Sequence, residues 1–357
     1  MYEALGITAL SAPQAAIVLG ALLGLTFGAL AEVTKFCFRR AVVGDRPALG
    51  VWAAGLVTAL LGTQAAVSAG LIGFSDHRFF AADLPVAAIV IGGLLFGAGM
   101  VLTRGCVSRL TVLLGSGNLR ALTVLLVFAV TAHATLKGVL APLRVALGQI
   151  TLPLGEAVSL ANWPGGAALW TAVIALAALA IALRSGAKPL HLGLAALLGL
   201  LVPAGWVGTG FVLFDDFDPI AMESLSFTSP MAETLFWGVA STSIPASFGV
   251  GLVGGVIAGA AVLSLIGGRF AWQSFESPRQ TGRYVLGAVL MGIGGVLAGG
   301  CTVGAGLSGI PTLSLAAILA LAAIAAGGVA TDRLLARAPS IPGYGARAAI
   351  PQVQPAE

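Results

Sequence analysis

The sequence predicts an all-α, polytopic membrane protein, with about nine transmembrane helices supplemented by broken or re-entrant half-helices. Two observations predict this class. Of the 357 residues, 58% are hydrophobic and 9% are charged, with a mean hydropathy of +1.01; a soluble core cannot account for so apolar a chain. Apolar runs of membrane-spanning length also recur along the sequence. The short alternating segments of a lipid-facing β-barrel are absent.

The apolar runs define the expected helices in chain order. They lie near residues 12–31, 48–72, 85–103, 119–140, 166–183, 190–213, 240–266, 285–300 and 313–331. The first run ends in "GALAEV", which resembles a signal-peptide cleavage site, but the preceding residues contain Glu3 and no Lys or Arg. We therefore expect the first run to be a retained helix.

Basic residues alternate with the expected crossings and predict an orientation. They follow the first, third, fifth, seventh and ninth runs, beginning with Lys35, Arg104, Arg184, Arg269 and Arg333. By the positive-inside rule, the N-terminus lies outside and the C-terminus in the cytoplasm, where residues 332–357 form a disordered tail. The net charge of +4 then reflects loop asymmetry rather than a nucleic-acid partner.

An internal repeat surrounds the cysteines. "FGAGMVLTRGC" ends at Cys106 and "MGIGGVLAGGC" ends at Cys301, with glycines at matching positions; "FGALAEVTKFC", ending at Cys37, is a looser copy. A fourth copy, "LGLLVPAGWVG", ends at Gly208 without a cysteine. With the predicted orientation, the chain is a single transporter domain of two inverted repeats, about 10–145 and 185–335, joined by the span 166–183.

Glycine and proline mark the positions where helices are expected to break. Most of the 50 glycines are expected to permit close helix packing. The stretches 97–106 and 292–311 are instead expected to line a path, because irregular backbone survives at membrane depth only beside protein or a water-filled cavity. Pro203 and Pro245 are candidate sites for further breaks.

Three cysteines at equivalent positions suggest a cargo that interacts favourably with sulfur. Their spacing contains no CxxC pair and predicts no metal site. For proton coupling, Glu32 and the pair His133 and Lys137 are candidates, although an interfacial carboxylate, a packed histidine and a snorkelling lysine explain them as well. His77 lies near a loop and is expected to have only a solvent role, as is His191.

The motifs "TKFCFRRAVV", "LTRGCVSRL" and "LAGGCTVGAGLSG" resemble the three cysteine motifs of the YeeE/YedE-type sulphur-transport family. The resemblance implies an hourglass-shaped path in the bacterial inner membrane, along which thiosulfate makes transient contacts with thiols. It implies no cofactor, and a TusA-like sulfur carrier or a rhodanese-type protein as the cytoplasmic partner. The implied substrate-binding residues are Cys37, Cys106, Cys301, Gly105, Gly300, Thr302 and Gly304. Where the Cys106 copy has Arg104 and Arg109, the Cys301 copy has Gly299 and Gly304, so no arginine role extends to the second half.

Alternatives to a thiosulfate transporter stay open. The cargo can be another sulfur or selenium compound. A membrane sulfurtransferase would form a persulfide on one cysteine, and only Cys37, between Lys35 and Arg39, has cationic neighbours in sequence. A structural or channel-like protein would tolerate serine at all three positions. Because no catalytic grouping or nucleotide loop is evident, we expect a transporter, with Cys301 near the outer mouth and Cys37 and Cys106 further in.

Overall fold

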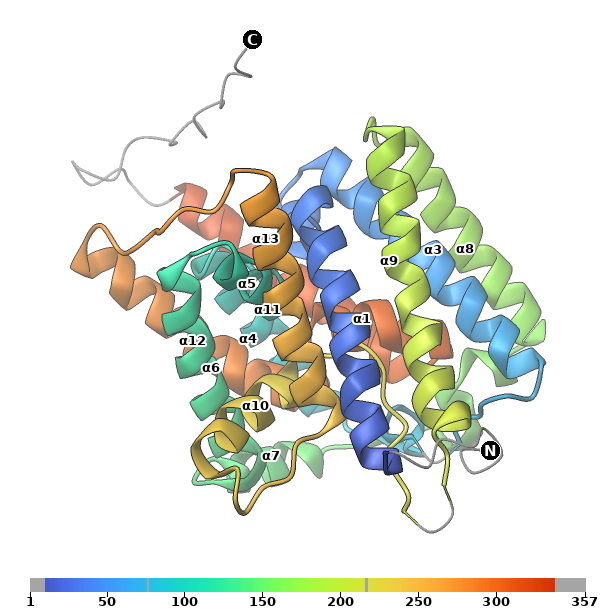
Figure 1. Cartoon of the computed structure of the whole chain (residues 1–357). Coiled ribbons are helices and arrows are strands. Elements are labelled where there is room, and N and C mark those ends of the chain that lie inside the picture. Colours follow the sequence, from blue (N-terminus) through green and yellow to red (C-terminus); the bar gives the residue numbers. More distant parts are fainter. Residues whose placement is uncertain (1–9, 76, 216–217, 338–357) are drawn as a thin grey trace.

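The computed structural model describes residues 10–75, 77–215 and 218–337, and this part of the chain is predominantly helical (Figure 1). Nine helical segments within it are long and apolar enough to cross a membrane. The all-α polytopic class and the number of spans are therefore confirmed. The long helices are α1 (Ala12–Thr34), α3 (Arg46–Ser68), α4 (Val86–Leu102), α6 (Leu119–Lys137), α8 (Gly166–Arg184), α9 (Pro189–Val207), α11 (Phe248–Ile266), α12 (Pro278–Leu297) and α13 (Leu315–Arg337).

Shorter elements connect the long helices. They are α2 (Phe38–Val42), α5 (Val107–Gly115), α7 (Ala141–Gly148), α10 (Thr228–Ala240), the π-helical η5 (Gly208–Val212) and η6 (Thr302–Gly309), the 3-10 turns η2 (Arg78–Phe80), η3 (Gly155–Val158), η4 (Leu160–Asn162) and η7 (Ile310–Thr312), and the antiparallel strands β1 (Asp83–Leu84) and β2 (Leu152–Pro153). The sequence analysis did not anticipate α7, α10 or the strand pair.

Several of the expected boundaries need correction. The span expected at 240–266 begins later, because α10 ends at Ala240 and α11 begins at Phe248, with the candidate break Pro245 between them. The run 285–300 begins earlier, at Pro278, which occupies the first turn of α12 after the N-cap Ser277. Pro203 lies inside α9 without ending it. The expected tail also begins too early, since α13 continues to Arg337; residues 338–357 lie outside the described part.

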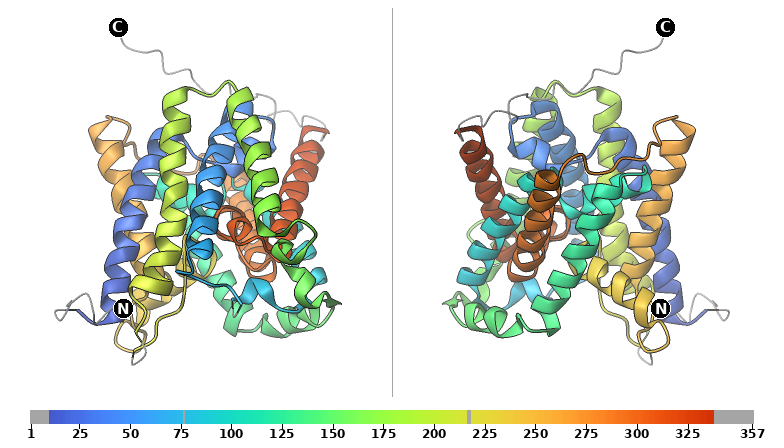
Figure 2. Two further views of the ribbon diagram at one scale, coloured as in Figure 1. Left: turned by 90° about the vertical axis from the view of Figure 1, so that its right-hand side faces the viewer. Right: turned by 90° about the vertical axis from the view of Figure 1, so that its left-hand side faces the viewer.

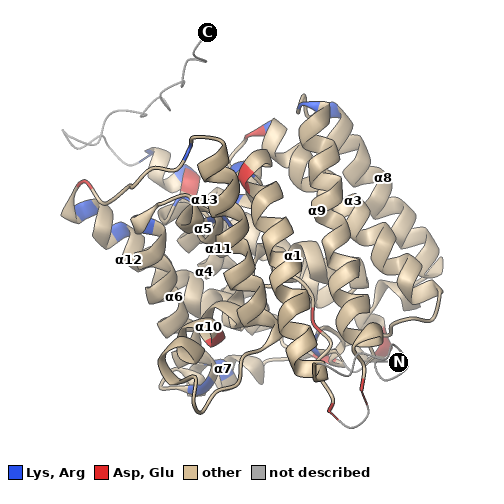
Figure 3. Cartoon of the chain, in the orientation of Figure 1, with Lys and Arg blue, Asp and Glu red and all other residues tan. Residues whose placement is uncertain are grey.

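The long helices run side by side between two ends of the molecule (Figure 2). α1 begins at one end and α13 finishes at the other. Lys and Arg gather at the end where α3 begins and where α8 and α13 finish, which we call the basic end (Figure 3). We call the opposite end, which carries the start of α1 and the loop before α10, the acidic end.

Glycine ridges hold the first and second halves of the chain together. Gly20, Gly24 and Gly28 of α1 pack on α11, where an added Cβ would lie 2.2 Å from a backbone carbonyl oxygen at each position. Gly251, Gly255 and Gly259 of α11 contact α1 in the same way. Glycine at every fourth position lets two helix backbones approach closely. Because lipid is as apolar as the helices, such close van der Waals packing, and not the hydrophobic effect, holds them together in a membrane.

Most glycines of the repeated motifs pack helices instead of lining a path. A Cβ on Gly97 would lie 2.1 Å from the Ile324 carbonyl oxygen of α13. A Cβ on Gly294 would lie 2.5 Å from the Gly92 carbonyl oxygen of α4. Gly97 and Gly294 therefore pack helices together, whereas Gly304 and Ser308 of η6 line the cavity described next. That the stretches 97–106 and 292–311 line a path stays a prediction.

Candidate functional site

Each cysteine occupies the N-cap position of a short helix after a break in a membrane-spanning segment. Cys37 precedes α2, Cys106 precedes α5 and Cys301 precedes η6, each with extended backbone at the N-cap. The three breaks lie inside the spans Ala12–Val42, Val86–Gly115 and Pro278–Thr312. The peptide N–H groups of a first helical turn have no partner within their own helix. The cysteines therefore lie beside amides that are available to other acceptors.

The three breaks share one backbone conformation. The residue two positions before each cysteine is left-handed, with φ of 53° at Lys35, 61° at Arg104 and 73° at Gly299. Positive φ is uncommon outside glycine, so its recurrence at one offset is a specific feature. The segment at Gly208 differs, since Trp206, two positions before it, lies inside α9 without a positive φ, and the helix continues into η5. The fourth copy of the sequence repeat therefore does not carry the left-handed turn of the other three.

The thiols lie close together inside the protein. Cys37 interacts with Cys106, and Cys106 interacts with Cys301. The Cys106 Sγ lies 3.2 Å from the Ser108 Oγ, while the Cys301 Sγ accepts a hydrogen bond of 3.3 Å from the Gly304 N–H. All three cysteines are reduced and buried, with at most 3% of their surface exposed. Cys106 is thus the central member of the group.

Thr302 adds a hydroxyl to this group. Its Oγ1 is buried and has no geometrically satisfactory hydrogen-bond partner within the described residues. The same hydroxyl lies near enough to interact with the Cys106 thiol. A buried hydroxyl without a good partner costs free energy, which a polar cargo passing here would recover.

A cavity of about 540 Å³ opens at the acidic end and reaches η6. Its walls come from η2, from the end of α9 with η5, from the loop before α10 and from η6. Its lining residues include His77, Arg78, Trp206, Thr209, Glu223, Ser226, Gly304 and Ser308. The cysteines are not among the lining residues, but Gly304 lines the cavity and donates to Cys301. Gly304 therefore connects the wall of the cavity with Cys301.

Charged groups face this cavity. The Arg78 side chain is accessible from the cavity. Protein atoms nevertheless surround it and exclude much of the solvent, which lowers its pKa from the ordinary value of arginine. Burial and the neighbouring carboxylate of Glu233 raise the pKa of Glu223 to about 7, against the opposing charge of Arg78. Burial, together with the Arg78 charge, lowers the pKa of His77 to about 4.

The cavity residues were missed by sequence reasoning. His77 does not have the solvent role expected of it: its ring lies 5.3 Å from Trp206 and 4.8 Å from Phe79, measured between centroids. The sequence does distinguish Arg78, because it is a basic residue in a loop on the side of the membrane where the expected loops are otherwise mainly acidic. Glu223 could not be connected with Arg78, because more than 140 residues separate them.

The predicted site residues are divided between two places. Cys37, Cys106 and Thr302 lie together in the interior, with Cys301 beside them. Gly304 lines the cavity. Gly105 and Gly300 are the residues immediately before Cys106 and Cys301, at the turns themselves. A Cβ on Gly300 would lie 3.0 Å from the Ala305 amide, whereas Gly105 has ordinary contacts with Leu110.

Two of the three proton-coupling candidates, Glu32 and His133, have structural partners. Glu32 is buried within the protein, with its carboxylate 3.7 Å from the Arg109 guanidinium and 3.5 Å from that of Arg269. The His133 ring stacks on Phe236 with 3.8 Å between centroids, as a packed histidine does. Lys137 is exposed in the last turn of α6.

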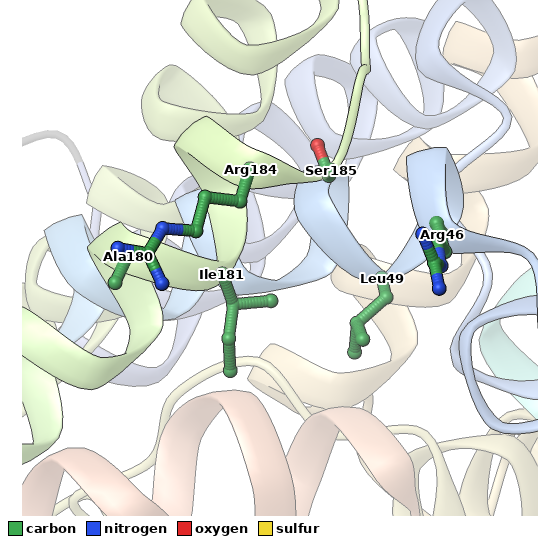
Figure 4. A pocket seen from close by; sticks show the side chains of 6 residues that line it. All are labelled: Arg46, Leu49, Ala180, Ile181, Arg184 and Ser185. Atoms are coloured by element: carbon green, nitrogen blue, oxygen red, sulfur yellow. The ribbon is translucent and has the colours of Figure 1, made fainter.

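A second hollow lies at the basic end, between α3 and α8 (Figure 4). Its volume is about 350 Å³, and it is lined by Arg46, Leu49, Ala180, Ile181, Arg184 and Ser185. It contains none of the predicted site residues. Within the described ranges, no group of three His, Cys, Asp or Glu side chains is placed to hold a metal ion.

Comparison with known proteins identifies the family. The description "Sulphur transport" applies to a family that matches residues 33–330, which include all three cysteine breaks. The chain belongs to the sulphur-transport family. It is 31% identical over 246 residues to the thiosulfate transporter TsuA of Spirochaeta thermophila, covering 65% of this chain and 72% of the relative. It is 27% identical over 272 residues to the thiosulfate transporter TsuA of Escherichia coli K12, covering 69% and 72%.

Membership of this family makes the protein a multi-pass membrane transporter for a sulfur compound. The resemblance drawn from the cysteine motifs is thereby confirmed.

Proposed function

We propose that this protein imports thiosulfate through the bacterial inner membrane, from the acidic end to the basic end, with the three cysteines as successive contacts. The observation that carries the proposal is the shared geometry of the breaks: three buried cysteines occupy the N-cap positions of three short helices, and their thiols interact through Cys106. The family and the names of its two relatives support thiosulfate as the cargo.

The cavity provides the entrance. Arg78 offers a cation to an approaching oxyanion, and the cavity leads to Gly304 beside Cys301. The natural order of contacts is then Cys301, Cys106 and Cys37. Positive residues favour the cytoplasmic side of a membrane, so the basic end faces the cytoplasm and α1 begins outside. The two halves of the chain, about 10–145 and 185–335, act as inverted repeats around this path.

The chemistry suits a non-covalent relay. Thiosulfate has a soft terminal sulfur and charged sulfonate oxygens. Neutral thiols are weak donors that hold the sulfur without preventing its release, whereas a thiolate would repel a dianion. The first-turn amides of α5 and η6 can face the negative charge. Because the thiols are buried, passage requires a local movement of the helix breaks.

The driving force must overcome the membrane potential. Moving a dianion into a negative interior costs about 4.6 kcal/mol at 100 mV. Rapid consumption of the sulfur in the cytoplasm would offset this cost. A TusA-like carrier or a rhodanese-type protein at the basic end supplies that sink.

The test is uptake of sulfur-labelled thiosulfate by cells that lack other uptake routes but keep their sulfur metabolism. Cys301→Ser is the informative variant, because a serine Oγ still accepts from the Gly304 N–H and preserves the N-cap. We expect uptake to fall at least tenfold at matched expression, with Cys106→Ser and Cys37→Ser behaving alike. Ser264→Ala, which changes another small buried side chain, should retain uptake.

Three results would overturn the proposal. Equal uptake by the intact protein and all three serine variants would make the cysteines incidental. Failure of the intact protein to import thiosulfate would indicate another sulfur or selenium compound. A protein mass raised by one sulfur atom after exposure to thiosulfate would indicate a persulfide, and hence the sulfurtransferase alternative.

A further inference from the structure

Glu223 is fixed at the wall of the cavity by its backbone. The Thr209 hydroxyl of η5 donates a hydrogen bond of 2.7 Å to the Glu223 carbonyl oxygen and accepts one of 2.9 Å from the Glu223 N–H. The next residue, Ser224, donates to the Val202 carbonyl oxygen of α9 at 2.8 Å. These bonds attach the loop to the end of α9 and hold the Glu223 backbone at the cavity, which Glu223 lines.

The electrostatic neighbours of Glu223 come from two other elements. Arg78 of η2 attracts its carboxylate and Glu233 of α10 repels it. In the described residues, no ion pair within 4.0 Å joins Arg78 to Glu223. The imidazole of His77 lines the same cavity, whereas Asp215 and Asp218, on the loop that carries Glu223, are not among the lining residues. Arg78 is thus left open to a second negative partner.

Glu223 and His77, which both line the cavity, differ in the pH at which they titrate. The pKa of Glu223 is raised to about 7 by burial and by Glu233. The pKa of His77 is lowered to about 4 by burial and by Arg78, so His77 is neutral throughout the physiological range. A change of charge in the cavity between pH 6 and 8 is therefore assigned to Glu223.

We infer that Glu223 takes up a proton from the aqueous phase when a divalent oxyanion occupies the cavity beside Arg78. The inference rests on the proposed function, since thiosulfate is the divalent anion. Two negative charges beside a carboxylate disfavour its ionised form. By reciprocity, the protonated carboxyl favours binding of the anion by the same factor. One proton also removes one negative charge from the complex that thiosulfate makes with the cavity.

The sign of the pH dependence follows from this linkage. Below the pKa of the free protein, Glu223 is already protonated and the affinity for the anion is constant. Above that pKa, binding must draw a proton from solution and the affinity falls. If thiosulfate binds only the protonated form, its Kd rises about tenfold from pH 6 to pH 8, and about half a proton is taken up per anion at pH 7.

The experiment is titration calorimetry of the purified full-length protein in detergent with sodium thiosulfate, which stays a dianion over this range. Kd is measured at pH 6, 7 and 8, and at pH 7 in two buffers of different ionisation enthalpy to count protons. For the native protein we expect the tenfold rise and the half proton. Glu223→Gln should bind with a Kd that does not change with pH and without proton uptake. Glu223→Asp, which keeps a titratable carboxyl, should retain both effects.

The control is Glu156→Gln, an exposed carboxylate of η3 that does not line the cavity; its pH dependence should match the native protein. Thiosulfate binding by the native protein without pH dependence or proton uptake would overturn this inference alone, as would full pH dependence in a folded Glu223→Gln variant. Absence of thiosulfate binding by the native protein at every pH would overturn the proposed function together with it.

Discussion

The Glu32 carboxylate lies 3.7 Å from the guanidinium of Arg109, and this ion pair joins two of the three cysteine breaks. Glu32 is in the last turns of α1, before Cys37, whereas Arg109 is in α5, directly after Cys106. Arg109 also donates a hydrogen bond of 3.3 Å to the Ala31 carbonyl oxygen. Arg269 also approaches the same carboxylate, at 3.5 Å. Glu32 therefore fixes the relative position of the two breaks near the basic end.

Glu32→Gln is expected to destabilise the protein. The Glu32 side chain is 7% exposed and the Arg109 side chain 14%, so the substitution leaves a nearly buried guanidinium without its counter-charge. Removing one partner of a buried pair costs about 3 kcal/mol. The measurement is the thermal unfolding midpoint of the purified protein in detergent, which should fall by several degrees.

The matched control for Glu32 is Glu276→Gln. Glu276 pairs with Arg120 at 2.8 Å, but its side chain is 77% exposed, so water replaces the lost partner. Exposed ion pairs contribute about 0–1 kcal/mol. Equal midpoints for the two variants would show that the Glu32 cluster is no more important than a surface pair.

Neighbouring glycines of α11 provide a test of the packing between α1 and α11. A Cβ at position 255 would lie 2.2 Å from the Ala21 carbonyl oxygen, while at position 254 nothing lies within 4 Å. Gly255→Ala forces the two helices apart and should cost about 2 kcal/mol, in the range of overpacked cores. Gly254→Ala meets open space and gains helix propensity, so its unfolding midpoint should stay constant or rise. A larger loss in Gly254→Ala would contradict the packing described.

The sequence was sufficient to predict the spans, because bilayer thickness imposes one length and one polarity on every crossing. Pro245 marked a candidate break in the run 240–266, and α10 and α11 are separated there, but the start of α11 at Phe248 was not predicted. The glycines of the repeats were assigned to a path because the sequence does not reveal which helix packs against them. Gly97 and Gly294 look alike in sequence whether they face a pore or another helix, and only the packed partner, α13 or α4, decides between these roles.

The candidate site was predictable only where its residues carry a local pattern. Cys37, Cys106 and Cys301 could be identified because each follows a glycine-containing motif at a fixed interval. Arg78 and Glu223 carry no such pattern, since their meeting depends on how η2 and the loop before α10 are placed by helices distant in sequence. Charge alone marked Arg78 as unusual for its side of the membrane.

The left-handed residues before the cysteines predict opposite effects of glycine and alanine. Lys35 is exposed at a φ of 53°, so Lys35→Gly relieves a strained backbone and should stabilise the protein by up to about 1 kcal/mol. Lys35→Ala keeps the strain and serves as the control. Gly299→Ala should cost about 1 kcal/mol by φ alone, because the nearest atom to its Cβ is 4.0 Å away. Chemical unfolding of the three variants measures these differences, and a stabilised Gly299→Ala would contradict the shared conformation.

The contact between Gly304 and Ser226 predicts a transport defect that a second substitution repairs. Both residues line the cavity, and a Cβ at position 304 would lie 2.7 Å from the Ser226 Oγ and 3.3 Å from its Cβ. Gly304→Ala therefore pushes the loop before α10 away from η6. The displacement occurs at the residue whose N–H donates a hydrogen bond to the Cys301 Sγ. We expect thiosulfate uptake to fall severalfold while the thermal midpoint changes little. Ser226→Ala alone should transport normally, and the double variant should recover most of the lost uptake because the closest clash is removed. If the double variant is as impaired as Gly304→Ala, the defect comes from the backbone of η6 rather than from the space between these two residues.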